Sequence, residues 1–563
     1  MSDITKTLRS CINCRQFMTA LLIIFPFAAM LWVWFSSLSF VPVPWPDDSA
    51  FYFVAKELFK WPPRWVMLPQ APFEPTYRIW NFNTMPLYPI LLGLGRMIGI
   101  DGIFAIKIFP LGAWAMSGSL LGVVLYKKGL PFLLSLLIAM TFMMDPTLRW
   151  ASVIVRPESL IGFCGVALVL GLTFGFPERF RPRRFWNPIS ALLVTAAYAH
   201  FNAVHLLFPV VLSLAFSLRQ KSVKHSFKQL LHIGATGLLY LSPWLFTVII
   251  KFPLFVHQMT TQWTRLSYGN NWLSTTEIAL KSLFQDLGSP EPWPNILYFS
   301  AYFVAAFIFL GLIWGVVIPL IQKLRFGILK TSPQDPSEVD LLPAGAWLLG
   351  SIWIWDSKPE VWFTSFLHLS LWTFLGIATL KLYRCKIKGA WAALTIPVSV
   401  CLVIFTHVNY SQAERLSQTQ TWKWPVYRDF IDCIDQQLIK DNAKNNVTPY
   451  RVWAPTFPDI TIELSLRHPN WEFTRTNDFA ERADLAVQHG RDVEAVVVPE
   501  MINWTERQIS ASAPSTSDEP VPTSSVWMTW KAYFLNRLWI EKGWKPNRYI
   551  CQRGRWQAFI FLK

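Results

Sequence analysis

Charged residues are scarce in this sequence of 563 residues. They make up 15% of the chain, whereas hydrophobic residues make up 53%. A soluble domain ordinarily carries about a quarter charged residues and under half apolar ones. The shortage of charge therefore excludes the ordinary soluble class. Aromatic residues are plentiful, with 30 Trp and 43 Phe, and such an excess suits helices that end in membrane interfaces.

Cysteine is also sparse, with seven in the whole chain. Cys11 and Cys14 form a single CxxC, and neither a second pair nor a nearby His completes a zinc site. This spacing favours free thiols. Cys433 and Cys551 both fall in the C-terminal part of the chain, where an oxidising compartment would allow a disulfide between them.

The net charge of +16 is spread in a way that argues against a nucleic-acid partner. The basic residues stand in short runs between apolar stretches, which is how the positive-inside rule appears in a sequence. We therefore expect membrane lipids, and no nucleic acid, among the partners.

Eleven apolar runs divide the first 408 residues. The first run, 17–40, follows three basic residues, is too long for a signal-peptide core, and has no small-residue cleavage site after it. It predicts a retained helix that enters from the cytoplasm. The other runs lie at 103–126, 130–144, 157–176, 187–199, 203–218, 229–250, 298–321, 342–355, 361–380 and 390–408.

Lys and Arg fill every second gap between these runs, as at Lys127-Lys128 and again from Lys381 to Lys388. The alternation predicts a polytopic α-helical protein of the inner (plasma) membrane with about 11 transmembrane helices, in a range of roughly 11 to 13. The same rule places the N-terminus in the cytoplasm and the C-terminus on the periplasmic or extracellular side. The long gap 41–102 is then a first outer loop, with short amphipathic pieces in place of a clean span.

After residue 408 the pattern changes, which predicts an extracytoplasmic domain over 409–563. Phe430, Ile431, Ile434 and Leu438 recur at helical spacing. Strand-like runs follow at 450–454, 494–498, 548–551 and 557–562. Helix and strands of this size predict a small α/β soluble domain.

Two adjacent carboxylates, Asp47 and Asp48, follow the first apolar run. Charges this close to hydrocarbon are costly unless they are paired, bound to a metal or used in chemistry. A helix cap is the structural alternative, because Asp commonly precedes a helix. Arg156 and Glu158 flank Pro157 at the outer start of a later run, where they could also simply pair with each other.

Two more outer gaps carry polar or ionisable side chains: His200, Asn202, His205, Asp356, Lys358 and Glu360. Four short outer segments thus bring such groups to one membrane face. Arg156 or Lys358 could hold an anionic headgroup there, with a carboxylate facing the reacting carbon. The convergence carries this interpretation, since no single motif does.

These features together resemble the GT-C superfamily of membrane glycosyltransferases, which includes protein O-mannosyltransferases, aminoarabinose transferases of lipid A and bacterial members of the glycosyltransferase 39 type. In that family an acidic pair opens the first outer loop, matched here by Asp47-Asp48, with Phe51 at the usual aromatic position. Pro86-Leu87-Tyr88 matches a Pro-Leu-Tyr stretch, and Arg156-Pro157-Glu158 matches an Arg-Pro-Asp motif. A His-Pro-Asn-Gly stretch has a looser counterpart in His200-Phe201-Asn202-Ala203.

The resemblance covers the layout of nearly the whole chain through short motifs. Two departures stand out: the second acid is Asp where Glu is common, and the basic residue that often precedes the Pro-Leu-Tyr stretch is missing. The missing basic residue bears on the contacts to the donor phosphate.

The resemblance implies an inverting transfer of a sugar from a polyprenyl-phosphate donor to a lipid, glycan or protein acceptor of the cell envelope. Asp47 would be the general base, because it matches the first acid of the family pair. Asp48 and Glu158 would orient the acceptor or bind a metal.

The same resemblance implies groups that hold the lipid phosphate and a metal. Arg156, Lys358 and Arg78 are the candidates for the phosphate. Either basic side chains or a divalent cation, Mg or Mn, would stabilise the charge on the phosphate, and Asp48, Glu158 and His200 are the candidate ligands of such a cation.

Two other functions fit part of the pattern. A lipid-linked sugar flippase or a small-solute transporter would place ionisable residues near the bilayer midplane and show paired half-repeats, whereas here these residues gather at one edge and no repeat is visible. An assembly factor would explain the C-terminal domain but leave Asp47-Asp48 idle.

Overall fold

The computed structural model describes most of the chain. The described residues are 2–37, 46–65, 80–82, 84–102, 105–183, 185–220, 223–266, 339–357, 364–384, 395, 398–400, 402–404, 406–407, 424–455, 460–476, 493–501, 547–553 and 556–562.

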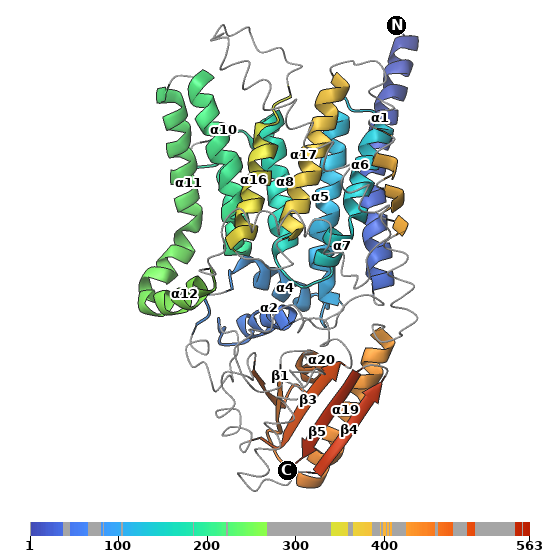
Figure 1. The fold of residues 1–563 in the computed structure, drawn as a ribbon, viewed down its shortest axis with the longest axis vertical. Coiled ribbons are helices and arrows are strands. Elements are labelled where there is room, and N and C mark those ends of the chain that lie inside the picture. Colours follow the sequence, from blue (N-terminus) through green and yellow to red (C-terminus); the bar gives the residue numbers. More distant parts are fainter. Residues whose placement is uncertain are drawn as a thin grey trace, which may run out of the picture.

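A bundle of long helices fills one half of the molecule, and a mixed sheet with two helices fills the other (Figure 1). Short helices lie between the two halves. The N-terminus stands at the far end of the bundle from the sheet (Figure 1). We refer to these two ends of the bundle as the N-terminal end and the sheet end.

The bundle is built from α1 Ser2–Ser37, α5 Ile108–Lys127, α6 Phe132–Met144, α8 Glu158–Phe174, α9 Pro188–Ala199, α10 Leu207–Gln220, α11 Val223–Ile250, α16 Leu342–Ser357 and α17 Thr364–Arg384. Shorter elements are α2 Pro46–Leu58, α4 Leu87–Met97, η1 Ala105–Lys107, α7 Pro146–Ser152, η2 Glu178–Phe180, η3 Phe201–Leu206 and α12 Phe252–Leu266.

Nine of the eleven predicted apolar runs coincide with these bundle helices. The run 298–321 and most of the run 390–408 lie outside the described residues. Within the described part, four helices are long and apolar enough to cross a membrane, namely those containing Cys14–Phe35, Ala105–Lys127, Ser226–Ile250 and Ser365–Arg384. Several other bundle helices are apolar but shorter, so the count of about 11 spans stays a prediction.

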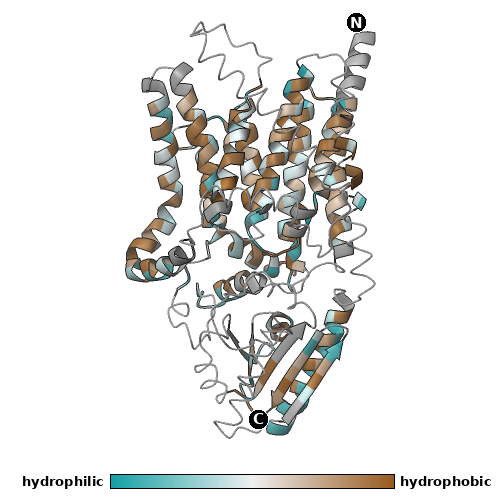
Figure 2. Cartoon of the chain, in the orientation of Figure 1, coloured by the Kyte–Doolittle hydropathy of each residue, from teal (hydrophilic) through white to brown (hydrophobic). Residues whose placement is uncertain are grey.

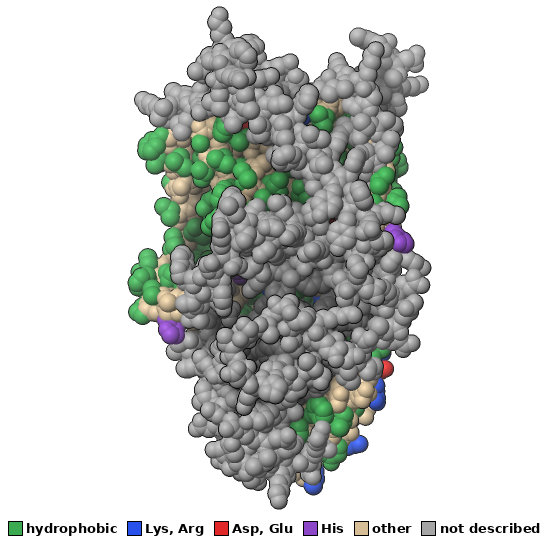
Figure 3. Space-filling view, viewed as in Figure 1, with side chains coloured by type: hydrophobic (Ala, Val, Ile, Leu, Met, Phe, Trp, Pro, Cys, Tyr) green, Lys and Arg blue, Asp and Glu red, His purple; other side chains and the backbone are tan. Residues whose placement is uncertain are grey.

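The flanks of the bundle expose large apolar side chains. On α11, Phe246, Ile249 and Ile250 are all more than half exposed, and Figure 2 shows brown, hydrophobic ribbon along the whole bundle. Hydrophobic side chains also gather over one flank in the space-filling view of Figure 3. An exposed apolar surface of this extent suits contact with lipid.

Inside the bundle, glycines let helices approach closely. A Cβ at Gly165 of α8 would lie 2.4 Å from the ring of Trp347 on α16, and one at Gly350 would lie 2.7 Å from the backbone oxygen of His205. Small residues at such crossings are typical of helix packing in membranes. The contacts hold α8, α16 and η3 together near the sheet end.

The C-terminal half contains α19 Trp424–Asn445, α20 Thr461–Arg467 and a five-stranded sheet of order β2-β1-β3-β5-β4. The strands are β1 Arg451–Pro455, β2 Glu472–Thr476, β3 Ala495–Met501, β4 Asn547–Arg553 and β5 Trp556–Leu562. β1 pairs in parallel with β2 and β3, and β5 pairs antiparallel with β3 and β4.

The helix and the four strands predicted for this region are confirmed. The periodic face of α19 is buried as its spacing predicts, since Phe430, Ile434 and Leu438 are fully covered. β2 was not predicted, because apolar and polar residues do not alternate clearly in its sequence, EFTRT. The domain boundary predicted at residues 408 and 409 lies outside the described residues.

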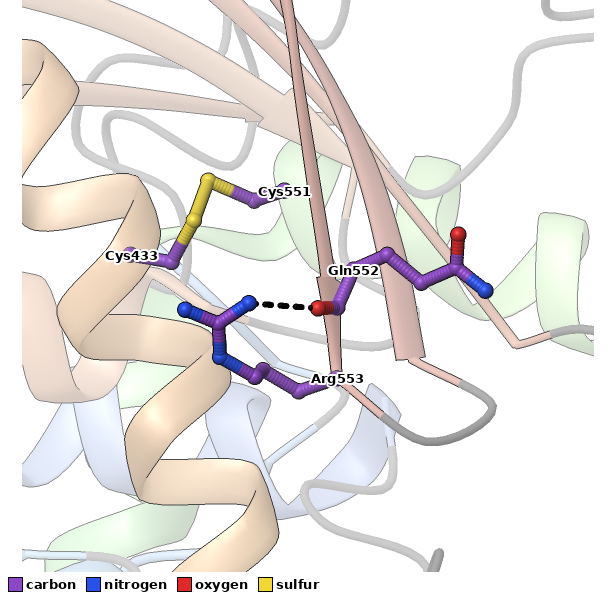
Figure 4. Close-up of a disulfide and its surroundings, with 4 residues drawn as sticks. All are labelled: Cys433, Cys551, Gln552 and Arg553. Carbon is purple, nitrogen blue, oxygen red and sulfur yellow. Dashed lines mark hydrogen bonds between the residues drawn. A yellow bond between two sulfur atoms is a disulfide. The ribbon is translucent and has the colours of Figure 1, made fainter.

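Cys433 and Cys551 form the disulfide that the sequence allowed, with Cα atoms 5.8 Å apart (Figure 4). It ties α19 to β4 across 118 residues of sequence. A cross-link over so long a loop restricts the unfolded chain strongly. Cys14, one of the cysteines expected to be free, is exposed and unpaired.

One apolar cluster joins the two halves of the molecule. Phe51 of α2, Tyr88 of α4 and Val155 of the α7–α8 loop are buried in the same cluster as α19 and the sheet. The helices α2 and α4 therefore share a buried apolar cluster with α19 and the sheet.

Candidate active site

The acidic pair lies in the first turn of α2. Pro46 begins the helix, with Asp47 and Asp48 directly after it. Pro suits the first turn because its missing N–H has no partner there in any case, and acids favour the unpaired N–H groups of a helix start. The helical backbone of this turn is described, whereas the side chains of both acids lie outside the described part.

Three stretches matched by the family resemblance meet at this turn. Phe51, one turn after Asp47, packs edge-on against Tyr88 at 5.3 Å between ring centroids. Val155, the residue before Arg156, is buried in the same cluster. Stretches separated by up to about a hundred residues of sequence thus share one apolar support at the sheet end.

Arg156 and Glu158 pair with each other, as the structural alternative predicted. Nε and Nη2 of Arg156 both donate to Oε1 of Glu158, at 3.0 and 2.7 Å. Both side chains are buried. The second carboxylate oxygen of Glu158, Oε2, is buried and has no hydrogen-bond partner among the described residues, so its lone pairs are available to another group.

Two buried cations near this pair went unpredicted. Lys107 donates from Nζ to the backbone oxygen of Val153 at 2.8 Å, and the guanidinium of Arg149 lies 5.5 Å above the ring of Trp32. Burial lowers the pKa of Arg149 to about 10, which leaves it charged at neutral pH. Lys107 thus contacts the α7–α8 loop directly, whereas Arg149 faces α1 from α7.

A buried carboxylate and a histidine also meet at the sheet end. Asp145, between α6 and α7, accepts from Nδ1 of His368 at 2.7 Å and from Nε1 of Trp372 at 2.8 Å. The pair joins residues 223 positions apart. Sequence spacing gives no signal for a contact at this range.

The stretch that leads into α4 is fixed by its backbone. Gln258 of α12 accepts from the backbone nitrogen of Phe82 and donates to the backbone oxygen of Trp80, both at 2.7 Å. Nε1 of Trp65 donates to the backbone oxygen of Asn81 at 2.6 Å. These bonds hold the backbone of residues 80–82, before Pro86, in place.

A second polar network connects α2 to α4. The hydroxyl of Tyr52 donates to Asp101 at 2.9 Å, and Nε of Arg96 donates to the same oxygen at 3.0 Å. Burial is the largest cause that raises the pKa of Tyr52, and Asp101 raises it further. The phenol thus stays protonated and fixes the rotation of α2.

The other predicted site residues have separate positions. His200 caps η3, because its Nδ1 accepts from the backbone nitrogen of Asn202 at 3.2 Å. Arg78 and Lys358 lie outside the described residues. Within the described part of the chain no group of three or more His, Cys, Asp or Glu side chains is placed to hold a metal, and the side chain of Asp48 falls outside that part.

The chain matches no protein-family model and no curated protein. Among solved structures it is similar to ArnT from Cupriavidus metallidurans in the apo state, with a TM-score of 0.54 at 11% identity, covering 96% of this chain and 97% of the other. The same protein bound to undecaprenyl phosphate gives a TM-score of 0.51 at 12% identity, with the same coverage.

A third similarity, to the Saccharomyces cerevisiae protein O-mannosyltransferase Pmt1-Pmt2 complex bound to the sugar donor, covers 43% of this chain and 34% of the other. Its TM-score of 0.30 at 15% identity is too low for an argument about fold. The chain thus has the fold of ArnT over nearly its whole length, and four of its described helices are long and apolar enough to cross a membrane.

The pKa of Lys56 allows a test of the burial of α2. Burial is the main cause that lowers its pKa to about 8 from 10.5, and Arg96 and Lys60 lower it further. Between these two values the unfolded chain binds more protons than the folded protein, so stability should increase as the pH rises from about 8 toward 10.5.

We expect Lys56→Met to remove this contribution. The measurement is the thermal unfolding midpoint of the detergent-solubilised protein and of the variant at several pH values above about 7.5. The wild type should gain more stability with pH than the variant does. Equal pH dependence in the two proteins would contradict the burial of this amine.

Proposed function

We propose that this protein is an integral membrane glycosyltransferase that moves a sugar from a polyprenyl-phosphate donor to an acceptor at the sheet end. The single observation that carries the proposal is that Phe51, Tyr88 and Val155 lie in one apolar cluster. Phe51 follows the Asp47-Asp48 turn by one helical turn, and Val155 directly precedes the Arg156–Glu158 pair. The shared fold with ArnT, which has been solved bound to undecaprenyl phosphate, supports the class of donor.

The reaction assigns one task to each kind of group. Asp47 takes the proton from the acceptor hydroxyl or amine, and the freed electron pair forms a bond to the anomeric carbon. The bond from that carbon to the phosphate oxygen breaks, and polyprenyl phosphate leaves with its electron pair. Attack opposite the leaving group inverts the anomeric carbon.

The leaving phosphate needs positive charge close by, because negative charge develops on it as the bond breaks. Arg156 is one candidate. It bonds to one oxygen of Glu158, and the negative charge of that carboxylate offsets part of the positive charge of Arg156. Lys107 and Arg149 add buried cations beside the same loop. Arg78 and Lys358 stay candidates from the sequence.

Glu158 is suited to orient the acceptor or to hold a divalent cation. Mg and Mn prefer oxygen ligands, and Oε2 of Glu158 is a buried oxygen with no hydrogen-bond partner. Asp48 and His200 are the other proposed ligands. A cation bound here would supply positive charge to the leaving phosphate.

The proposed sidedness places the N-terminal end in the cytoplasm and the C-terminal domain outside it, with the protein in the inner (plasma) membrane. Basic residues mark the N-terminal end, where Arg15 donates to the backbone oxygen of Lys127 and Arg384 donates to that of Lys128. Cytoplasmic loops carry such residues in excess. The disulfide between Cys433 and Cys551 supports an oxidising compartment for the sheet.

Transfer of radiolabelled sugar from a panel of polyprenyl-phosphate sugars to membrane extracts tests the proposed reaction. Asp47→Asn removes the base with almost no change in shape, so we expect transfer to fall by about 100- to 10,000-fold at equal protein level. Glu158→Gln should also lower transfer, because it weakens the pair with Arg156 and removes the negative charge that Oε2 shares.

The matched control is Glu178→Gln. Glu178 also pairs with an arginine, Arg181, but it is 85% exposed on η2, so transfer should stay at the wild-type level. Wild-type transfer in both Asp47→Asn and Glu158→Gln would refute the proposed roles. Movement of a solute or lipid by a protein that transfers no sugar would favour the flippase or transporter instead.

Sidedness has its own test. After reduction of intact cells or spheroplasts, a membrane-impermeant maleimide should label Cys433, the less buried cysteine of the disulfide, but leave Cys14 unlabelled until the membrane is opened. Cys14 is exposed in the structure, so only the membrane would protect it. Labelling of Cys14 from outside, with Cys433 protected, would invert the topology.

A further inference from the structure

His368 offers a buried hydrogen-bond acceptor that the proposed reaction does not use. Its partner Asp145 is 1% exposed and accepts three hydrogen bonds: from the backbone nitrogen of Leu148 at 3.1 Å, from Nδ1 of His368 at 2.7 Å and from Nε1 of Trp372 at 2.8 Å. Three donors around one carboxylate satisfy its charge.

This arrangement fixes which ring nitrogen of His368 faces Asp145. An ionised carboxylate can only accept, so Nδ1 of His368 carries a hydrogen, and in the neutral imidazole Nε2 is then an acceptor. The side chain of His368 is 8% exposed, and Nε2 is buried with no hydrogen-bond partner in the part of the chain that the structure describes. A buried polar atom without a partner is costly, which points to a partner supplied by a ligand.

The chemistry of Nε2 selects the ligand group. A lone pair beside the negative charge of Asp145 suits a neutral O–H donor and does not suit a phosphate, which at neutral pH brings negative charge. A sugar hydroxyl is a neutral O–H donor of this kind.

The position of His368 relates this acceptor to the proposed active site. His368 is the fifth residue of α17, about 6 Å along the helix axis from its first residue. Its neighbour Leu369 is in close contact with α8, since a Cβ at Gly162 would lie 2.4 Å from Leu369 Cδ1. Gly162 stands one turn from Glu158, so α17 carries His368 at the level of the active site.

We propose that His368, held by Asp145, forms a subsite that accepts a hydrogen bond from a hydroxyl group of the donor sugar. The proposal rests on the proposed function, because it takes the donor to be a sugar on a polyprenyl phosphate. A sugar attached to a membrane lipid can reach a position inside the bundle near its sheet end. His368 binds in this account, while the proton of the acceptor still goes to Asp47.

Equilibrium binding to the full-length protein in nanodiscs separates the sugar from the lipid. The probes are undecaprenyl phosphate and a panel of undecaprenyl-phosphate hexoses and pentoses. His368→Asn keeps an amide N–H near the position of Nδ1 for Asp145 and removes the acceptor at Nε2. We expect it to weaken binding of the best sugar-bearing lipid by about 3- to 10-fold, with binding of undecaprenyl phosphate unchanged.

Two further variants sharpen the comparison. His368→Gln can place its amide oxygen near the position of Nε2, so it should keep more affinity for the sugar-bearing lipid than His368→Asn does. Ser370→Ala is the control for packing, because Ser370 is buried on the same helix and bonds only to the backbone oxygen of Leu367. This control should bind both lipids as the wild type does.

The outcomes distinguish failure of the proposed subsite from failure of the proposed glycosyltransferase function. An equal loss of affinity for both lipids in His368→Asn, or no loss for either, would overturn the subsite and leave the glycosyltransferase standing. A wild type that binds neither the bare lipid phosphate nor any sugar-bearing form would overturn the proposed function, and the subsite with it.

Discussion

The apolar cluster between the first outer loop and the C-terminal domain is the contact on which the proposed site depends. Phe51, Tyr88 and Val155 share it with the buried face of α19 and with the sheet. Burial of large side chains is the dominant favourable term in such packing. Phe51 lies one helical turn after Asp47 and Val155 directly precedes Arg156, so the cluster supports the segments that carry these two proposed site residues.

The sheet and α19 therefore help to position α2 and α4. Its disulfide ties α19 to β4, and α19 contributes Phe430 and Ile434 to the shared cluster. A change that loosens the domain would also loosen the support of α2. The disulfide thus stabilises the part of the structure against which α2, the helix that begins with Asp47 and Asp48, is packed.

Buried polar groups at the sheet end also bear on the proposed site. Glu158 and His368 each pair on one side and leave one buried atom without a partner, Oε2 and Nε2. An unsatisfied buried polar atom is unfavourable for folding. Such atoms persist where another molecule satisfies them, which is why both are assigned to ligand contacts.

Much of the bundle could be predicted from local patterns. Apolar runs fixed the approximate position of helices such as α8 and α9, and alternation in β5 follows the inward and outward faces of a strand. The short amphipathic helix α7 was missed because its seven residues are too few for a clear period. The polar strand β2 was missed for want of alternating apolar residues.

The site was accessible to sequence reasoning only in part. Motif resemblance selected Asp47 and Glu158, and the backbone brings their segments together as that resemblance implies. It could not select Lys107, whose role depends on a contact with a backbone oxygen 46 residues away. Nor could it select His368, because only the folded chain places it beside Asp145.

A cryo-electron microscopy structure of the full-length protein with undecaprenyl phosphate would test the central claim most directly. The account predicts that the phosphate lies at the sheet end, beside the α7–α8 loop and within reach of Arg156 or of the cations Lys107 and Arg149. A phosphate seated instead at the N-terminal end, among Lys127, Lys128 and Arg384, would contradict the account.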